Sequence, residues 1–206
     1  MNDDVPYPRF ASRGRAYVYV LPCKGEDLLK VGFSRDPFTR FRTLHRQFYD
    51  FFDLDRGLLI EVERVSAARR IERCFIETWP EHRAPAPLVV REAAAGYTEW
   101  YRGIDPQVRA LAHALADAGG HRLYEPLRPW LRALLTERAD WLYAGTAHLL
   151  DAVEYERFHG DPRQPVQRAL LDLLDMCWAL ELPLGDLLPP ALLAWYTHGP
   201  RDSAVS

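Results

Sequence analysis

The feature that most constrains the fold is a pair of short apolar segments joined by a link of six residues. Residues 16–21, AYVYVL, alternate aromatic and β-branched side chains, which is typical of a strand. Residues 28–33, LLKVGF, have the same character, and the link over residues 22–27 contains Gly25. Two strands with so short a connection predict an antiparallel β-hairpin.

Capping residues and prolines indicate where the next elements begin and end. Asp36 is a good N-cap and Pro37 a good first helical residue, so a helix is predicted from there to about Tyr49. Residues 57–65 predict a third strand, and Ser66 is predicted to cap a second helix that ends at Trp79. An extended segment is predicted at 97–102, and five helices near 106–118, 126–136, 139–157, 164–181 and 190–197.

This order of elements predicts an α+β fold, in which a small antiparallel β-sheet with flanking helices precedes an α-helical C-terminal region. The sequence becomes rich in Leu and Ala at about Asp105, so a boundary is expected near 103–106. We therefore expect an N-terminal arm over 1–15, a first domain over 16–103 and a helical domain over 104–206.

Several features argue against a membrane or secreted protein. The most apolar stretch, residues 170–196, is interrupted by four carboxylates and three prolines, so no run of about 18 apolar residues remains to span a bilayer. Residues 1–10 are acidic and lack an apolar core, so we expect no signal peptide. Cys23, Cys74 and Cys177 are widely spaced, which predicts neither a disulfide framework nor a zinc site. These features favour a cytoplasmic location.

The two halves of the chain differ in charge. Residues 1–103 hold 17 Lys and Arg against 15 Asp and Glu, a net charge of +2, whereas residues 104–206 hold 9 against 14, a net charge of −5. The basic residues of the first half are nearly all arginine, whose guanidinium fork matches phosphate oxygens. Four of them, Arg35, Arg40, Arg42 and Arg46, follow the second strand directly. This cluster makes nucleic acid a candidate partner.

The first predicted helix has an apolar face and a basic face. Arg42 and Arg46 lie on the side away from the apolar face, where they point to solvent or phosphate. Arg40 falls at the edge of the apolar face, so it either serves a site or is a snorkelling side chain whose stem covers apolar surface. His45 falls within the apolar face, and it either aids proton transfer and phosphate binding or is a buried structural histidine.

One acidic residue stands out in the second predicted helix. Glu72 falls inside the apolar arc, between Trp79 and Ile76. Burial of a carboxylate there is costly unless it is paired or binds a metal. Glu72 is therefore either half of a structural salt bridge, with Arg40 as a candidate partner, or a functional residue.

The hairpin supplies a third group of candidate residues. Tyr17 and Tyr19 share one face of the first strand, and Lys30 and Gly32 share one face of the second. A tyrosine pair is common in β packing, whereas a lysine two residues before a glycine on a central strand is less expected. Pairing of the two strands is predicted to bring Lys30 near Tyr19.

Together these motifs resemble the GIY-YIG nuclease superfamily, especially its branch of small phage and bacterial proteins with YVYV and KVG motifs. Tyr19 and Gly32 are 13 positions apart, Arg40 lies eight after Gly32 and matches the family's essential arginine, and Glu72 matches its metal-binding glutamate. The segment 97–102, YTEWYR, is similar to the branch's terminal EWF element. The resemblance covers about residues 15–103. Two departures are Tyr17 in place of the first motif glycine and Lys30 in place of the second motif tyrosine.

The resemblance implies a metal-dependent endonuclease that hydrolyses phosphodiester bonds in nucleic acid, with DNA favoured over RNA. It implies that Tyr19 is the general base, with Lys30 and Arg40 favouring its phenolate. Glu72 is implied to hold Mg²⁺, with Mn²⁺ as the alternative ion. The implied catalytic residues are Tyr19, Arg40, Glu72, Lys30, Tyr17 and His45, and the implied contacts to flanking phosphates are Arg35, Arg42 and Arg46.

Two alternatives stay open at this point. The first is a catalytically inactive module of the same fold that binds nucleic acid or a protein. The second is a structural α+β protein whose resemblance to the nucleases is accidental. The charge of −5 on the second half repels nucleic acid and favours a partner role, which is dimerisation, docking to a larger complex, or covering of the basic half as a cap.

Overall fold

The computed structural model describes residues 14–90, 99–159 and 164–198. The chain divides into two compact units, Met1–Arg128 and Pro129–Ser206. The first unit holds a five-stranded antiparallel sheet with flanking helices, and the second is helical. The α+β fold predicted from the sequence is thereby confirmed.

The sheet is built around the predicted hairpin. Its strands are β1 (Ala16–Pro22), β2 (Leu29–Ser34), β3 (Leu58–Val62), β4 (Trp100–Tyr101) and β5 (Arg122–Tyr124), in the order β4-β2-β1-β3-β5. The register of the hairpin places Tyr19 opposite Gly32 and Leu21 opposite Lys30. Within the described residues, β4 pairs with Leu29 and Lys30, and the outer edge of β2 beyond Val31 pairs with no strand. Among the described residues, β2 is therefore paired on that side only as far as Val31.

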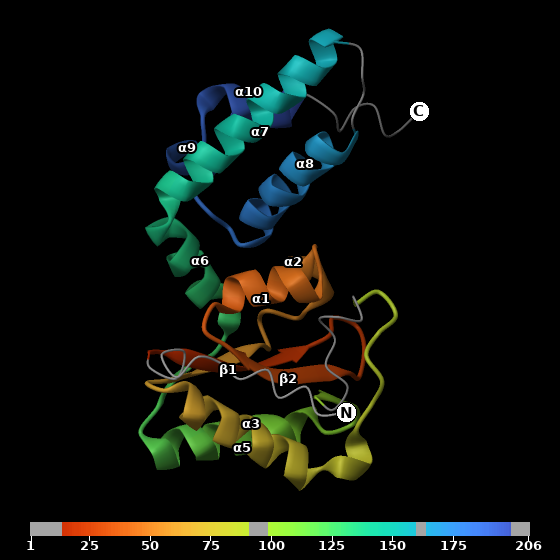
Figure 1. Cartoon of the computed structure of the whole chain (residues 1–206), viewed down its shortest axis with the longest axis vertical. Coiled ribbons are helices and arrows are strands. Elements are labelled where there is room, and N and C mark those ends of the chain that lie inside the picture. The colour runs from red at the N-terminus through yellow and green to blue at the C-terminus, as the bar shows by residue number, and fades with distance from the viewer. Residues whose placement is uncertain (1–13, 91–98, 160–163, 199–206) are drawn as a thin grey trace. The chain divides into compact units, whose positions relative to one another are not determined.

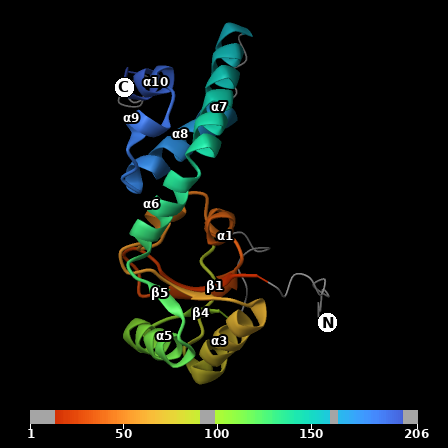
Figure 2. The same ribbon diagram turned by 90° about the vertical axis from the view of Figure 1, so that its left-hand side faces the viewer.

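Helices cover both faces of this sheet (Figure 1 and Figure 2). On one face, α3 (Val65–Thr78) and α5 (Asp105–Gly119) pack against the alternate apolar residues of the strands, such as Val18 and Ile60. On the other face lie α1 (Pro37–Leu44) and α2 (Phe48–Phe51). There the ring of Phe41 meets the ring of Tyr19 edge to face, with 5.3 Å between centroids. Strand alternation thus places Tyr19 and Val18 against different helical layers.

The structure corrects three local predictions. The helix predicted to reach Tyr49 ends at Leu44, because His45 is extended and its ring stacks on Phe51, 4.4 Å away between centroids. A continuous helix, with about 100° between successive side chains, does not allow that contact. Ser66 is not the cap of α3, since Arg64 occupies the N-cap position. Strand β5 was not predicted from the sequence.

The two compact units do not meet at the predicted boundary near 103–106. Helix α5 contributes Val108, Ala112 and Ala116 to the core of the first unit, and β5 pairs with β3. The division between the two units lies instead between Arg128 and Pro129. Of the predicted N-terminal arm, residues 1–13 lie outside the described residues, as do residues 97 and 98 of the predicted extended segment.

The second unit is formed by helices joined through short links. After α6 (Leu127–Glu137), which spans the boundary, come α7 (Ala139–His159), α8 (Gln164–Ala179), α9 (Leu184–Leu187) and α10 (Pro190–His198). Leu142, Leu170 and Leu174 are fully buried in it. In the part of the chain that the structure describes, no helix combines the length and apolar character needed to cross a membrane.

Candidate active site at the edge of the sheet

A cavity of about 470 Å³ lies at the end of β2. Residues from β1, the end of β2, α1, α3 and the position before β4 line it. Four of the residues singled out in the sequence are among them: Tyr19, Arg35, Arg40 and Glu72. Elements far apart in sequence therefore bring the strongest sequence candidates to one cavity.

Gly32 allows the hydroxyl of Tyr19 to reach this cavity. A Cβ atom at position 32 would lie 2.5 Å from the hydroxyl oxygen of Tyr19 and 2.7 Å from its Cζ, well inside van der Waals contact. The phenol ring therefore crosses β2 directly above the glycine. Because Phe41 contacts the ring as well, the tyrosine is held in place and is only 1% exposed.

Helix α1 positions Arg40 over the same hydroxyl group. Asp36 caps the helix by accepting a hydrogen bond from the backbone N–H of Thr39 at 3.2 Å, as the sequence predicts. One turn later, Nε of Arg40 donates a hydrogen bond to the hydroxyl oxygen of Tyr19, at 3.2 Å. Arg40 is thus directed toward a polar group of the cavity. A snorkelling side chain, whose charged head points to water, does not need such a partner.

Helix α3 supplies the carboxylate of Glu72. Val65, Arg69 and Glu72 follow the helical repeat, so all three face the cavity. Among the described residues Glu72 forms no ion pair, so the structural salt bridge to Arg40 is not formed. The pKa of Glu72 is raised to about 7, by burial first and then by the nearby Glu99, while Lys30, Arg40 and Arg69 limit that rise. The carboxyl group is therefore poised to gain or lose a proton near neutral pH.

Glu99 is a member of the site that sequence reasoning missed. Its Oε2 accepts a hydrogen bond from Nζ of Lys30 at 2.9 Å, and its backbone oxygen accepts one from the N–H of Val31 at 2.9 Å. Lys30 is fully buried, and its Nζ lies 5.1 Å from the centroid of the Trp100 ring. Burial lowers the pKa of Lys30, and Glu99 counteracts that effect. The acidic residue of the EWY segment was a usable signal, but its pairing with β2 was not visible in the sequence.

The structure corrects the expected activation of Tyr19. Burial raises the pKa of its phenol to about 12, and the nearby Arg40 offsets only part of this effect. Lys30 is directed to Glu99 and does not stabilise the phenolate. Tyr19 is therefore a neutral phenol at neutral pH, which accepts a hydrogen bond from Arg40 and has its own proton to donate.

Four other predicted site residues do not line the cavity. Tyr17 lies near Glu61 and Tyr124, and its pKa is raised by burial first and then by Glu61. The other three belong to α1 or the residues that follow it: His45 stacks on Phe51, Arg42 lies over the ring of Phe38 at 5.4 Å, and Arg46 is exposed.

No protein-family model, curated protein or solved structure matches this chain. What the site can do therefore follows from its side chains. Three carboxylates, three guanidinium groups and one phenol line the cavity, a set suited to binding a phosphate ester together with a cation.

The donor set fits a hydrated Mg²⁺ ion. Mg²⁺ is commonly held by one or two carboxylates and keeps several waters. In the described ranges, no cluster of three or more His, Cys, Asp or Glu side chains is placed to hold a metal. Glu72, whose negative charge is disfavoured by burial and by Glu99, offers the carboxylate that a cation would stabilise.

Proposed function

We propose that this chain is a metal-dependent endonuclease that hydrolyses phosphodiester bonds in nucleic acid, and that DNA rather than RNA is its substrate. The observation that carries the proposal is the meeting of Tyr19, Arg40 and Glu72, from three separate elements, at one cavity. The choice of DNA follows the resemblance to GIY-YIG nucleases.

Each residue has a distinct role in the proposed reaction. Arg40 binds the scissile phosphate and neutralises the charge that develops on its oxygens. The hydroxyl of Tyr19, fixed by Arg40 and Phe41, holds the attacking water in line with the phosphorus atom. The water oxygen forms the new bond to phosphorus, the bond to the leaving oxygen breaks, and the proton of the water passes to solvent. Glu72 would hold Mg²⁺, or Mn²⁺ in its place, and the ion would supply charge neutralisation at the leaving oxygen. Arg35 and Arg69 line the same cavity and contact flanking phosphates.

The second candidate function is a binding module of the same fold that does not cut. The observation that favours it is the raised pKa of Tyr19, because a phenol with a pKa of about 12 is a poor general base at neutral pH. In that case Arg35, Arg40 and Arg69 bind nucleic acid without hydrolysis.

We propose that the helical unit binds a protein partner, and that a second copy of the chain is the first to test. Tyr143, Tyr155 and Trp178 are 50%, 65% and 67% exposed, and exposed aromatic side chains are frequent at protein interfaces. A cytoplasmic setting is favoured by the free thiols of Cys23, Cys74 and Cys177.

A cleavage assay distinguishes the two candidate functions. Purified full-length protein is incubated with labelled single-stranded DNA, double-stranded DNA and RNA in Mg²⁺, Mn²⁺ or EDTA. The variants Glu72→Gln and Arg40→Ala are compared with Glu77→Gln, which removes an exposed carboxylate from the same helix. We expect metal-dependent cleavage of DNA that is lost in the first two variants and retained in the third. Binding of DNA without cleavage under any condition would favour the binding module, and equal cleavage by wild type and Glu72→Gln would refute the proposed site.

A further inference from the structure

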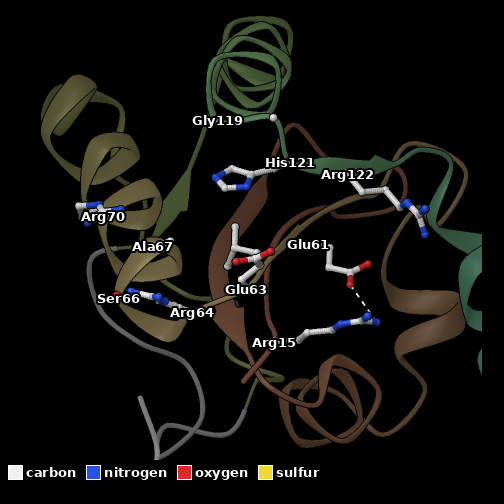
Figure 3. A pocket seen from close by; sticks show the side chains of 12 residues that line it. Arg15, Glu61, Glu63, Arg64, Ser66, Ala67, Arg70, Gly119, His121 and Arg122 are labelled. Atoms are coloured by element: carbon white, nitrogen blue, oxygen red, sulfur yellow. Dashed lines mark ion pairs between the residues drawn. The ribbon is translucent and has the colours of Figure 1, made fainter. Parts of the chain in front are cut away.

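A second cavity, of about 580 Å³, lies between the end of β3, the start of α3 and the turn after α5 (Figure 3). Arg64 and Arg70 line it from α3, and His121 lines it from the turn that follows α5. None of these three residues belongs to the candidate active site. The cavity is therefore a separate concave surface on the first unit.

The lining of this cavity is basic. Four arginines face two glutamates, namely Arg15, Arg64, Arg70 and Arg122 against Glu61 and Glu63. The charge of Glu61 is already matched within the protein, because Arg15 forms an ion pair with it at 3.1 Å and the hydroxyl of Tyr124 donates to it at 2.6 Å. Among the described residues, neither Arg64 nor Arg70 forms an ion pair. The side of the cavity formed by α3 therefore presents unmatched positive charge.

Two glycines position His121 at this cavity. Gly120 adopts a left-handed conformation with φ of 59°, and the backbone N–H of His121 then donates to the carbonyl oxygen of Ala116 at 2.8 Å. A Cβ atom at Gly119 would lie 2.4 Å from the imidazole ring of His121. The ring thus lies against the glycine, and Figure 3 labels both residues beside the end of α5.

Residues at one end of the sheet line both cavities. Ser34, at the end of β2, lines the first cavity, and Glu61 and Val62, at the end of β3, line the second. Only β1 lies between these strands, so their ends are about 10 Å apart, at roughly 4.8 Å for each strand spacing. That separation corresponds to about three nucleotides at roughly 3.4 Å of rise each.

Basic side chains lie between the two cavities. Arg35 of the first cavity lies against Gly14, where a Cβ atom would be 3.2 Å from its Nη2 atom. The next residue, Arg15, lines the second cavity. A polyanionic strand that crosses this end of the sheet therefore meets guanidinium groups along its path.

We propose that the second cavity is a phosphate subsite, in which Arg64, Arg70 and His121 hold a backbone phosphate of the strand whose scissile phosphate lies near Arg40. Arginine forks and imidazole N–H groups are good donors to phosphate oxygens, and such contacts orient a strand without reading its sequence. The assignment to a nucleic-acid phosphate rests on the proposed function, whereas the affinity of the cavity for phosphate does not.

The first test measures binding of labelled DNA in EDTA by fluorescence anisotropy at several salt concentrations, so that no cleavage occurs. Arg64→Gln and Arg70→Gln are compared with Arg73→Gln, which removes the same charge from an exposed position one turn along α3. We expect each of the first two variants to weaken binding about tenfold and to lower the slope of log K against log salt by about 0.9. Arg73→Gln is expected to bind within about twofold of wild type. Equal binding by all three variants would overturn the proposal.

The second test uses inorganic phosphate alone, titrated into the full-length protein while the backbone amide signals of Gly120 and His121 are followed by NMR. We expect these signals to shift in wild type and in Arg73→Gln, and to remain unmoved in Arg70→Gln. Unmoved signals in wild type would overturn the subsite whatever the nuclease assay shows. If wild type neither binds nor cuts nucleic acid, the proposed function fails. If phosphate still shifts these signals in that case, the phosphate site stands and only its assignment to a nucleic-acid strand is overturned. The amide spectra also show whether each variant is folded.

Discussion

Replacement of Glu72 by Gln should make the first unit more stable at high pH and leave its stability unchanged at low pH. The reason is the environment of the carboxyl group, whose burial and proximity to Glu99 raise its pKa from 4.5 to about 7. Between these two values the folded protein holds a proton that the unfolded chain has lost. Stability therefore falls as the pH rises from about 4.5 to 7, and the full cost persists above 7.

The size of the effect follows from the change in pKa. At about 1.4 kcal/mol for each pH unit, a rise from 4.5 to about 7 corresponds to roughly 3 kcal/mol. Partial contact with solvent reduces this value, so we expect a gain of about 2–3 kcal/mol for Glu72→Gln at pH 8 and close to zero at pH 4. The glutamine amide keeps the shape of the side chain, so its packing and hydrogen-bond effects are similar at both pH values.

The assay is urea denaturation between pH 4 and pH 8, followed through the NMR signals of amides in β1 and β2. These strands lie within the first unit, so their signals report its unfolding separately from that of the helical unit. Glu77→Gln is the control, because Glu77 is exposed on the same helix. A difference between wild type and Glu72→Gln that is the same at pH 4 and pH 8 would refute the electrostatic argument.

The same proteins test the proposed cation. At pH 8, Mg²⁺ should stabilise wild type by about 2.7 kcal/mol when its concentration is 100 times the dissociation constant. Glu72→Gln should gain little, because it lacks the charged carboxylate that binds the ion. Equal stabilisation of both proteins would place the ion elsewhere and remove Glu72 from the cofactor site.

Further substitutions test the packing of the site and the role of His45. Gly32→Ala should destabilise the first unit by about 1–3 kcal/mol in urea denaturation, and by less in a Tyr19→Leu background, because the new methyl group collides with the phenol; equal costs in both backgrounds would contradict this contact. Glu99→Gln should lower the stability by about 3–5 kcal/mol, because Lys30 loses its carboxylate partner. Lys30→Met should lower it by less, because the side chain of Glu99 is 23% exposed and can be hydrated. Thermal denaturation that ranks the two variants in the reverse order would refute this reasoning. His45→Ala should retain cleavage within about twofold, and a large loss would return His45 to the catalytic set.

Local patterns in the sequence were sufficient for the hairpin and for the residues that form the centre of the site. Strand alternation and a short link predict the hairpin, whose register in the structure places Tyr19 opposite Gly32, and capping by Asp36 predicts where α1 begins. Helical periodicity identified Arg40 and Glu72 as polar groups at apolar faces. These features depend on interactions within a few residues, so they are visible without the tertiary structure.

Contacts between distant segments decided the rest. Glu99 lies 69 positions from Lys30, and only the pairing of β4 with β2 brings the two together. The packing of α5 and β5 on the sheet moved the boundary between the units, and burial set the pKa of Tyr19 and of Glu72. Desolvation and long-range strand pairing depend on which surfaces are covered in the folded protein, and local sequence patterns do not contain that information.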